Sequence, residues 1–310
     1  MNAPAHFFPV QVRRRQERPP PLRVWLVVLA LVIAIVGLAS AYAQFRTPFP
    51  AERDVAFFDA QMRSLAQQQR TYRGQGQKPI SIIFIGTSRM KNVALDWRRV
   101  AASAKAAGVQ RPVASTYLAV NWGGFERFSP AIDRIERAHP DIVVIMPEFF
   151  FEDLSAFTRE LLGFTYLKSK MWQQPFKFFS KAEFYQPVCT DEDSPAARLS
   201  LNGEWMTRGT NLPGPRLARS SVERLSKAGI SVIIADVPVS ASLAKVRPRF
   251  AREDFFVAAH LQPLPNVNSV WIGHPFAKDD YCDWAHIDPS RAEVWERAFF
   301  SRIAPRLNSH

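Results

Sequence analysis

The chain has 310 residues, of which 47% are hydrophobic and 22% are charged. A chain of this length buries one large core, or one core together with a membrane segment, and its composition excludes intrinsic disorder. Its formal net charge of +12 suggests an anionic partner, but part of that charge is a basic cluster before residue 24: Arg13, Arg14, Arg15, Arg18 and Arg23, opposed by Glu17. The sequence has no zinc-ligand spacing, no glycine-rich RNA-binding signature and no long Lys/Arg stripe, so nucleic acid is not an expected partner. A basic surface equally suits lipid headgroups or an anionic polymer.

Residues 24–43 form an apolar run of twenty residues without a charge. At about 1.5 Å per residue such a helix spans roughly 30 Å, the thickness of the hydrocarbon core of a bilayer. The arginine cluster precedes the run, whereas the charges just after it nearly cancel, so the positive-inside bias keeps residues 1–23 in the cytoplasm as a basic tail. We therefore expect a single-pass anchor in a bacterial inner membrane, with everything after about residue 45 in the periplasm.

A cleaved signal peptide is the alternative, because the Ala-Tyr-Ala sequence at 41–43 matches the small-residue cleavage pattern. The long segment before the apolar run, and the length of the run itself, favour an uncleaved anchor. Both alternatives export the rest of the chain. In an oxidising compartment Cys189 and Cys282, the two cysteines of the sequence, can pair as a disulfide, and two separate thiols are the alternative.

The region between the anchor and the first expected strand, 44–78, is polar and rich in Gln and Arg. It predicts a short stalk and an amphipathic helix, because apolar residues recur at helical spacing: Val55, Phe58, Met62 and Leu65.

Nearly continuous apolar runs then predict four buried parallel strands, at 80–85, 114–120, 142–146 and 230–237. Helix-like stretches lie between them at 95–107, 128–138 and 215–228, and a final helix is expected at 289–307. This alternation predicts one α/β domain with a parallel sheet over 79–310. Residues 148–210 interrupt it with a segment rich in aromatic residues, which either pack an additional helical layer or line a groove for sugar rings.

Polar residues stand at the ends of three predicted elements. Ser88 follows the first strand in the sequence Gly-Thr-Ser-Arg, and Asn121 follows the second strand in Asn-Trp-Gly-Gly. Asp283 and His286 lie three positions apart, shortly before the final helix. In parallel sheets, active sites collect beyond the carboxyl ends of the strands. The sequence therefore places candidate chemistry at one edge of the expected sheet.

A serine hydroxyl is a poor nucleophile and needs a histidine base that a carboxylate orients. His286 and Asp283 offer both from one turn of chain. Backbone amides of Ser88 and of Gly123 or Gly124, with the Asn121 side chain, are candidate donors to a developing oxyanion. Taken singly, these residues also fit a turn or cap serine, a helix cap beside an exposed imidazole, and a tight turn. Their order along the chain favours the joint interpretation.

That order resembles the SGNH (GDSL-like) hydrolase superfamily over about residues 79–307. The resemblance implies a three-layer α/β/α flavodoxin-like fold with a parallel sheet. It implies that Ser88 is the nucleophile, His286 the general base and Asp283 the residue that orients it. The Ser88 amide and a glycine of 123–124 would form the oxyanion hole.

Two positions depart from the family pattern. Thr87 replaces the usual Asp, as in membrane-tethered branches with a Gly-[Thr/Ser]-Ser-Arg sequence. The third block of the family offers an oxyanion asparagine, whereas this chain has Glu148 in the sequence Met-Pro-Glu-Phe. Asn121 is the expected replacement donor. Loss of one such donor costs on the order of 3 kcal/mol of transition-state stabilisation.

Other polar residues are assigned more simply. Arg89 is either a structural ion-pair partner or a contact for a substrate anion, and Trp122 is a second candidate substrate contact. His260 and His274 stand apart from any carboxylate pattern and are expected to be structural. The sequence has no metal-ligand spacing and no glycine-rich phosphate loop, so neither a metal nor a cofactor is expected.

These features predict a membrane-anchored periplasmic esterase or acyltransferase with an acyl-serine intermediate. By the resemblance, its substrate is an O-acyl group, above all acetyl, of a secreted polysaccharide such as alginate or cellulose. A multi-spanning membrane acyltransferase or a polysaccharide synthase complex is the expected partner. The alternative is a scaffold or polysaccharide-binding subunit of such a complex, built on the same fold.

Overall fold

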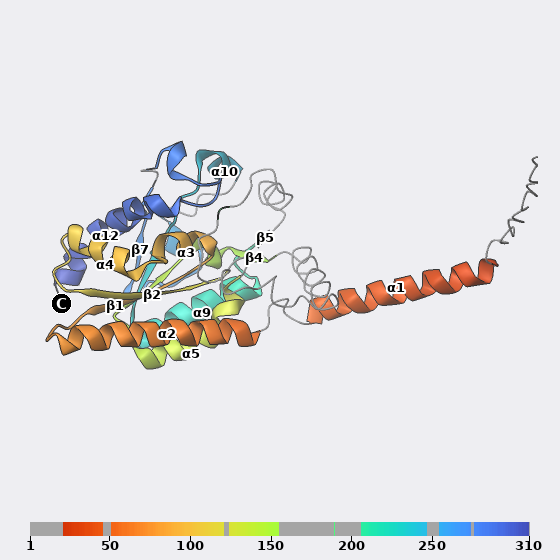
Figure 1. Cartoon of the computed structure of the whole chain (residues 1–310), viewed down its shortest axis with the longest axis horizontal. Helices are drawn as coiled ribbons and strands as arrows, with labels where there is room; N and C mark the ends of the chain where they lie inside the picture. Colours follow the sequence, from red (N-terminus) through yellow and green to blue (C-terminus); the bar gives the residue numbers. More distant parts are fainter. Residues whose placement is uncertain are drawn as a thin grey trace, which may run out of the picture.

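The protein is described from a computed structural model, which covers residues 21–45, 51–120, 124–154, 189, 206–246, 254–273 and 276–309. Its centre is a five-stranded parallel sheet with the order β2-β1-β3-β6-β7 (Figure 1). The strands are β1 (Ile80–Gly86), β2 (Val113–Ala119), β3 (Ile142–Ile145), β6 (Ser231–Ala235) and β7 (Val267–Val270). This order is consistent with the flavodoxin-like arrangement, in which ligands bind beside the first strand, where the strand order reverses.

The four strands expected from continuous apolar runs are all present. Every residue of β1, β2 and β3 is buried, which is why those runs show no alternation with polar residues. The sequence pattern missed β7, the edge strand, because only the two valines of its Val-Asn-Ser-Val sequence are buried.

Helices cover both faces of the sheet (Figure 1). One face carries α3 (Ser88–Ala94), α4 (Trp97–Ala106) and α12 (Ala292–Asn308). The other carries α2 (Ala51–Gly74), α5 (Ser129–Ala138) and α9 (Pro213–Lys227). The α/β class with a parallel sheet is therefore confirmed. On the first face Phe84 of β1 contacts Trp295 and Phe299 of α12 edge to face, with ring centroids 6.2 and 5.9 Å apart.

Smaller elements complete the described chain. The antiparallel pair β4 (Glu152–Leu154) and β5 (Met206–Arg208) forms a separate small sheet. The short helices are α10 (Ala241–Val246), α11 (Phe255–Ala258), η1 (Phe125–Phe128), η2 (Pro147–Phe150), η3 (Lys278–Asp280) and η4 (Pro289–Arg291).

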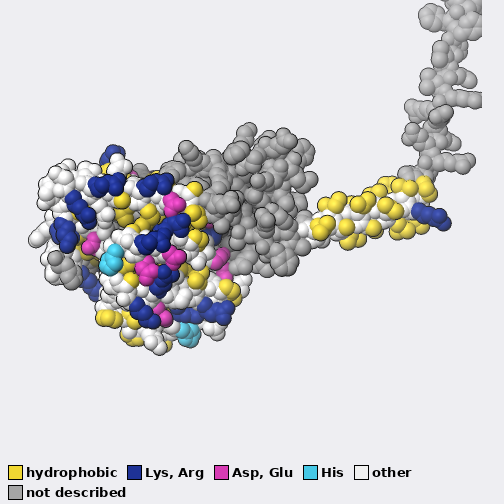
Figure 2. Space-filling view, turned by 90° about the horizontal axis from the view of Figure 1, so that it is seen from below, with side chains coloured by type: hydrophobic (Ala, Val, Ile, Leu, Met, Phe, Trp, Pro, Cys, Tyr) yellow, Lys and Arg dark blue, Asp and Glu magenta, His cyan; other side chains and the backbone are white. Residues whose placement is uncertain are grey.

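The predicted amphipathic helix is α2, and it is a layer of the folded domain. Phe58 and Leu65 are buried, and Phe57 packs against Tyr117 of β2. The Gln68 amide donates to the Ser115 carbonyl and accepts from the Ser115 N–H, both at 3.0 Å. The folded unit therefore begins at about residue 51, well before residue 79. Figure 2 shows basic and acidic side chains interspersed on the face that α2, α5 and α9 cover.

The expected membrane anchor lies in α1 (Leu22–Phe45), whose large hydrophobic side chains are exposed as far as Leu38, the last one described (Figure 2). Over the part of the chain that the structure describes, no helix has both the length and the apolar character needed to cross a membrane. The transmembrane assignment of 24–43 stays a prediction from sequence.

Most of the aromatic-rich segment 148–210 lies outside the described residues. In its described part, Phe149 and Phe150 are buried. Phe149 contacts Phe125 and Phe128, and Phe150 contacts Phe255. These rings belong to the core and not to a groove.

Candidate active site

Ser88 stands where the chain leaves β1 and enters α3. Gly86 ends the strand, and a Cβ there would collide with the side chains of Met90 and Met146. The Thr87 N–H points to Met146 Sδ at 3.4 Å. Because Gly86 has no Cβ, the backbone packs closely against the two methionines where the strand ends. The helix α3 begins two residues later with Ser88, which is half-buried.

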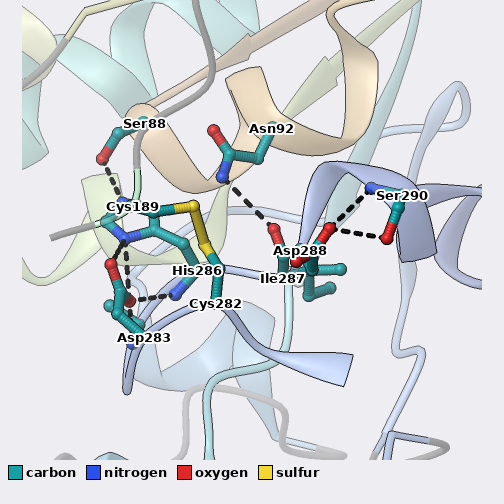
Figure 3. Close-up of a disulfide and its surroundings, with 10 residues drawn as sticks. Ser88, Asn92, Cys189, Cys282, Asp283, His286, Ile287, Asp288 and Ser290 are labelled. Atoms are coloured by element: carbon teal, nitrogen blue, oxygen red, sulfur yellow. Dashed lines mark hydrogen bonds and ion pairs between the residues drawn. A yellow bond between two sulfur atoms is a disulfide. The ribbon is translucent and has the colours of Figure 1, made fainter. Parts of the chain in front are cut away.

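Ser88, His286 and Asp283 form one hydrogen-bonded chain (Figure 3). Ser88 Oγ lies 2.8 Å from His286 Nε2, and Asp283 Oδ2 lies 2.7 Å from His286 Nδ1. Because a carboxylate only accepts, Nδ1 carries the proton and donates it to Asp283. Nε2 is then the basic nitrogen, and the Ser88 hydroxyl donates to it. This is the tautomer that general-base catalysis requires.

The Asp283 carboxylate is buried but well supplied with donors. Its side chain is 0% exposed, and that of His286 is 7% exposed. The backbone N–H groups of Ala285 and His286 both donate to Asp283 Oδ1 at 2.7 Å. A buried carboxylate costs free energy unless it is hydrogen-bonded, so these donors stabilise its ionised form beside the imidazole.

The loop that carries Asp283 and His286 is fixed at several points. It is closed by an antiparallel bridge between Tyr281 and Ile287 and by the Cys282 N–H, which donates to the His286 carbonyl at 3.1 Å. Asn92, one turn after Ser88 on α3, is fully buried and donates to the Ile287 carbonyl at 3.2 Å (Figure 3). One short helix therefore positions both Ser88 and the loop that carries His286. Sequence reasoning missed Asn92, whose one signal is its i+4 spacing from Ser88.

The same loop is held from two further sides. The Ser240 N–H and Oγ donate to the Trp284 carbonyl at 3.1 and 2.7 Å. Cys282, the neighbour of Asp283, forms a disulfide with Cys189 across a sequence separation of 93 (Figure 3). The pairing considered from the sequence is therefore present, and the alternative of two free thiols is not.

Arg89 is an internal ion-pair partner, the first of the two roles considered for it. Its guanidinium bonds Glu148 Oε1 at 2.5 Å and the Val237 carbonyl at 3.2 Å. The two side chains are 8% and 11% exposed. The contact of Arg89 with a substrate anion stays a prediction from sequence. Glu148 lies in η2, just after β3, and its carboxylate accepts from Arg89.

A second carboxylate shares this region. Asp236 follows β6 and accepts from the Ile272 N–H at 2.5 Å. Burial raises the pKa of Asp236 to about 6. The hydrogen bond from the Ile272 N–H opposes this rise, and the negative charge of Glu148 adds to it. Burial, with the charges of Asp280 and Asp236, likewise raises the pKa of Tyr281 to about 12. Tyr281 is therefore neutral at physiological pH and donates its hydroxyl to the Val239 carbonyl at 3.1 Å.

Only some of the predicted oxyanion donors lie within the described residues. Asn121, Trp122 and Gly123 lie outside the described residues. Gly124 is buried, and a Cβ there would meet the carboxylates of Glu126 and Asp153, which would have to shift. The Ser88 amide stands at the start of α3.

The two remaining histidine candidates add nothing to this arrangement among the described residues. His260 is exposed in a left-handed turn, and His274 is outside the described residues. Among the residues that the structure describes, no group of His, Cys, Asp and Glu is arranged to hold a metal ion.

Comparison of the chain with protein-family models, with curated proteins and with solved structures finds no match.

Proposed function

We propose that the protein is a serine esterase or acyltransferase of the SGNH type, which acts through an acyl-Ser88 intermediate. The observation that carries the proposal is the continuous chain of hydrogen bonds from Asp283 through His286 to Ser88. Chains of this kind activate serine for acyl transfer on unrelated folds. The position of Ser88 beyond the carboxyl end of β1, in a sheet of flavodoxin-like order, supports the same assignment.

In the first half-reaction, Ser88 Oγ attacks the carbonyl carbon of an ester while His286 Nε2 takes the hydroxyl proton. Asp283 stabilises the imidazolium that results. The C–O bond to the leaving alcohol breaks, and His286 returns the proton to its oxygen. In the second half, His286 deprotonates water or a sugar hydroxyl, which attacks the acyl-Ser88 carbonyl carbon. The bond from that carbon to Ser88 Oγ breaks, and His286 returns the proton to the serine oxygen. Water gives deacylation, and a sugar hydroxyl gives transfer.

The developing oxyanion needs donors beside Ser88. The amide of Ser88 is one, and Asn121 with a glycine of 123–124 supplies the others in this proposal. The apolar run 24–43 would anchor the enzyme in a bacterial inner membrane with its active site in the periplasm. O-acyl groups of a secreted polysaccharide are the proposed substrates, with a membrane acyltransferase as partner.

Hydrolysis of p-nitrophenyl acetate by the full-length chain tests the proposal. We expect turnover by the wild-type protein and none above background for Ser88→Ala. Ser290→Ala, which alters an exposed serine on η4, is the matched control and should keep the wild-type rate. Equal turnover by wild type and Ser88→Ala would sink the nucleophile assignment.

One observation favours a second candidate function. Glu148 accepts from Arg89 and cannot donate to an oxyanion, so one family donor is replaced by a buried ion pair. A polysaccharide-binding subunit of a synthesis complex would tolerate this replacement. It would bind the polymer equally well with Ser88→Ala and would show no esterase activity.

A further inference from the structure

Two loops meet where β1 and β2 begin, at the opposite end of these strands from Ser88. One loop follows α2 and leads into β1, and the other follows α4 and leads into β2 (Figure 1). Arg111 joins them, because its Nε and Nη2 donate to the carbonyls of Lys78 and Pro79 at 3.2 and 3.4 Å. The two loops therefore form one surface, and the seven residues of β1 place it roughly 23 Å from Ser88.

The end of α12 completes this surface. Asn308 donates to the Gly108 carbonyl at 2.9 Å and accepts from the Gln110 N–H at 3.1 Å, and both partners lie in the loop before β2. Figure 1 marks the C-terminus at this end of the domain. We call the surface the amino corner, and its cations are Arg73, Lys78, Lys105, Arg111 and Arg306.

The charge of the amino corner is of one sign. Residues 70–79, 104–112 and 302–309 contain three, two and two Lys or Arg residues, and no Asp or Glu. Four of the five corner cations are exposed, and Arg111 is half-buried. Among the residues that the structure describes, none of the five forms an ion pair with a carboxylate. Their charge is therefore available to an anion outside the domain.

Helix dipoles explain only part of this charge. Arg73, Lys105 and Arg306 stand in the last turns of α2, α4 and α12, where the dipole of each helix favours a cation. Lys78 and Arg111 lie in the two loops, outside any helix, and add to the same charge. The amino corner therefore holds more positive charge than its helix ends account for.

The other side chains of the amino corner indicate the class of anion. Gln75, Gln77 and Gln110 are exposed, and their amides can both donate to and accept from hydroxyl groups. Helices that bind at a membrane surface place large apolar side chains beside their cations. Over the described residues of 70–79, 104–112 and 302–309, no large hydrophobic side chain is exposed. Cations with amides, and without apolar side chains, suit a hydrated anionic polymer better than a bilayer.

We infer that the amino corner binds a polymer with repeated carboxylates, at a surface separate from Ser88. The Lys and Arg side chains pair with the carboxylates, and the exposed amides bond the hydroxyl groups of the polymer. The attraction of several cations to one polymer chain accumulates, and salt weakens it. The inference concerns charge and not acyl groups, so it holds whether or not Ser88 acts as a nucleophile.

Lysine modification locates the binding surface in the wild-type protein. Full-length protein in a non-ionic detergent is acetylated with N-hydroxysuccinimidyl acetate, alone or with polygalacturonate, and the modified lysines are identified by mass spectrometry. We expect polygalacturonate to protect Lys78 and Lys105 and to leave Lys278, an exposed lysine of η3, fully reactive. Dextran, a neutral polymer, should protect none of the three.

Two results of this experiment would overturn the inference. The first is equal protection of all three lysines by polygalacturonate, or protection of none. The second is protection of Lys78 and Lys105 by reconstitution into vesicles that contain phosphatidylglycerol, but not by polygalacturonate, which would identify a lipid surface instead.

A pair of triple variants tests the contribution of the charges. The first variant removes three exposed cations of the amino corner, by Lys78→Gln, Lys105→Gln and Arg306→Gln. The matched control removes three exposed cations from elsewhere on the domain, by Arg63→Gln, Arg98→Gln and Arg216→Gln. Because the six side chains are exposed, both variants should keep the urea unfolding midpoint of the wild type.

Both variants lose the same net charge, but only the first loses contacts with the polymer. At low ionic strength we expect the first variant to bind polygalacturonate about tenfold more weakly than the wild type, and the control to stay within about threefold. Equal weakening of the two variants would show that net charge alone attracts the polymer, and would refute a binding surface at the amino corner.

Discussion

Ser88 Oγ and His286 Nε2 lie 2.8 Å apart, although 198 positions of sequence separate the two residues. The contact is built by tertiary structure from both sides. Ser88 is fixed by the turn from β1 into α3, and His286 is fixed by a loop that Asn92 of the same helix holds. Because both partners depend on α3, a change in that helix displaces them together.

Asp283→Asn should abolish most activity while the site keeps its shape. The amide can still accept the Ala285 and His286 N–H groups, but its NH₂ group faces Nδ1 and forces the proton onto Nε2. His286 then cannot accept the Ser88 proton. We expect kcat on p-nitrophenyl acetate to fall by about 10⁴, the loss known for this change in other serine triads. A fall of less than tenfold, with an unchanged melting temperature, would contradict the orienting role of Asp283.

The sequence predicted the parts of the fold that depend on local composition. Continuous apolar runs identified β1, β2, β3 and β6 because these strands are buried on both faces. The two polar residues of β7 hid that strand, and α3 is too short to show a helical period. Local pattern therefore fails at the edge strand and in the turn that carries Ser88.

The site was partly predictable for a different reason. Ser88, Asp283 and His286 were found because their chemistry limits which residue types can cooperate. The residues that hold them are less specific in type. Asn92 and the pair of Arg89 with Glu148 acquire their roles from contacts across 195 and 59 positions of sequence. Such roles follow from the fold and not from spacing.

Arg89→Met should destabilise the protein more than removal of the whole ion pair. It leaves the Glu148 carboxylate buried without its guanidinium partner, which costs about 3–5 kcal/mol in comparable sites. The double variant Arg89→Met with Glu148→Met removes both charges and should recover a large part of that loss. Urea unfolding of wild type, both single variants and the double variant measures the coupling. Strictly additive effects would show that the pair contributes nothing as a pair.

Asp236 should make the protein less stable as pH rises through the weakly acidic range. Its pKa is about 6 in the folded protein, above the ordinary value of 3.8. The native state therefore binds more protons than the unfolded state between these values, and stability falls as pH increases from about 4 to 6. The full difference is at most about 3 kcal/mol.

Asp236→Asn imitates the protonated form and still accepts the Ile272 N–H. We expect the variant to gain stability over wild type as pH rises from 4 to 7, measured by urea unfolding at each pH. A constant difference between the two proteins over this range would show that Asp236 does not titrate as its burial implies.

The disulfide should support both stability and the catalytic loop. Cys189 and Cys282 close a loop with a sequence separation of 93, and removal of a native disulfide typically costs about 2–5 kcal/mol. Cys282 is also the neighbour of Asp283, and its N–H closes the loop onto the His286 carbonyl.

We expect the double variant Cys189→Ser, Cys282→Ser to unfold at lower urea concentration. Its kcat should fall while KM for p-nitrophenyl acetate changes little, because the bond supports the base and not the binding of a small ester. Treatment of wild type with dithiothreitol should reproduce both effects, and the variant should not respond to it. A fall in stability with an unaltered kcat would confine the disulfide to a structural role.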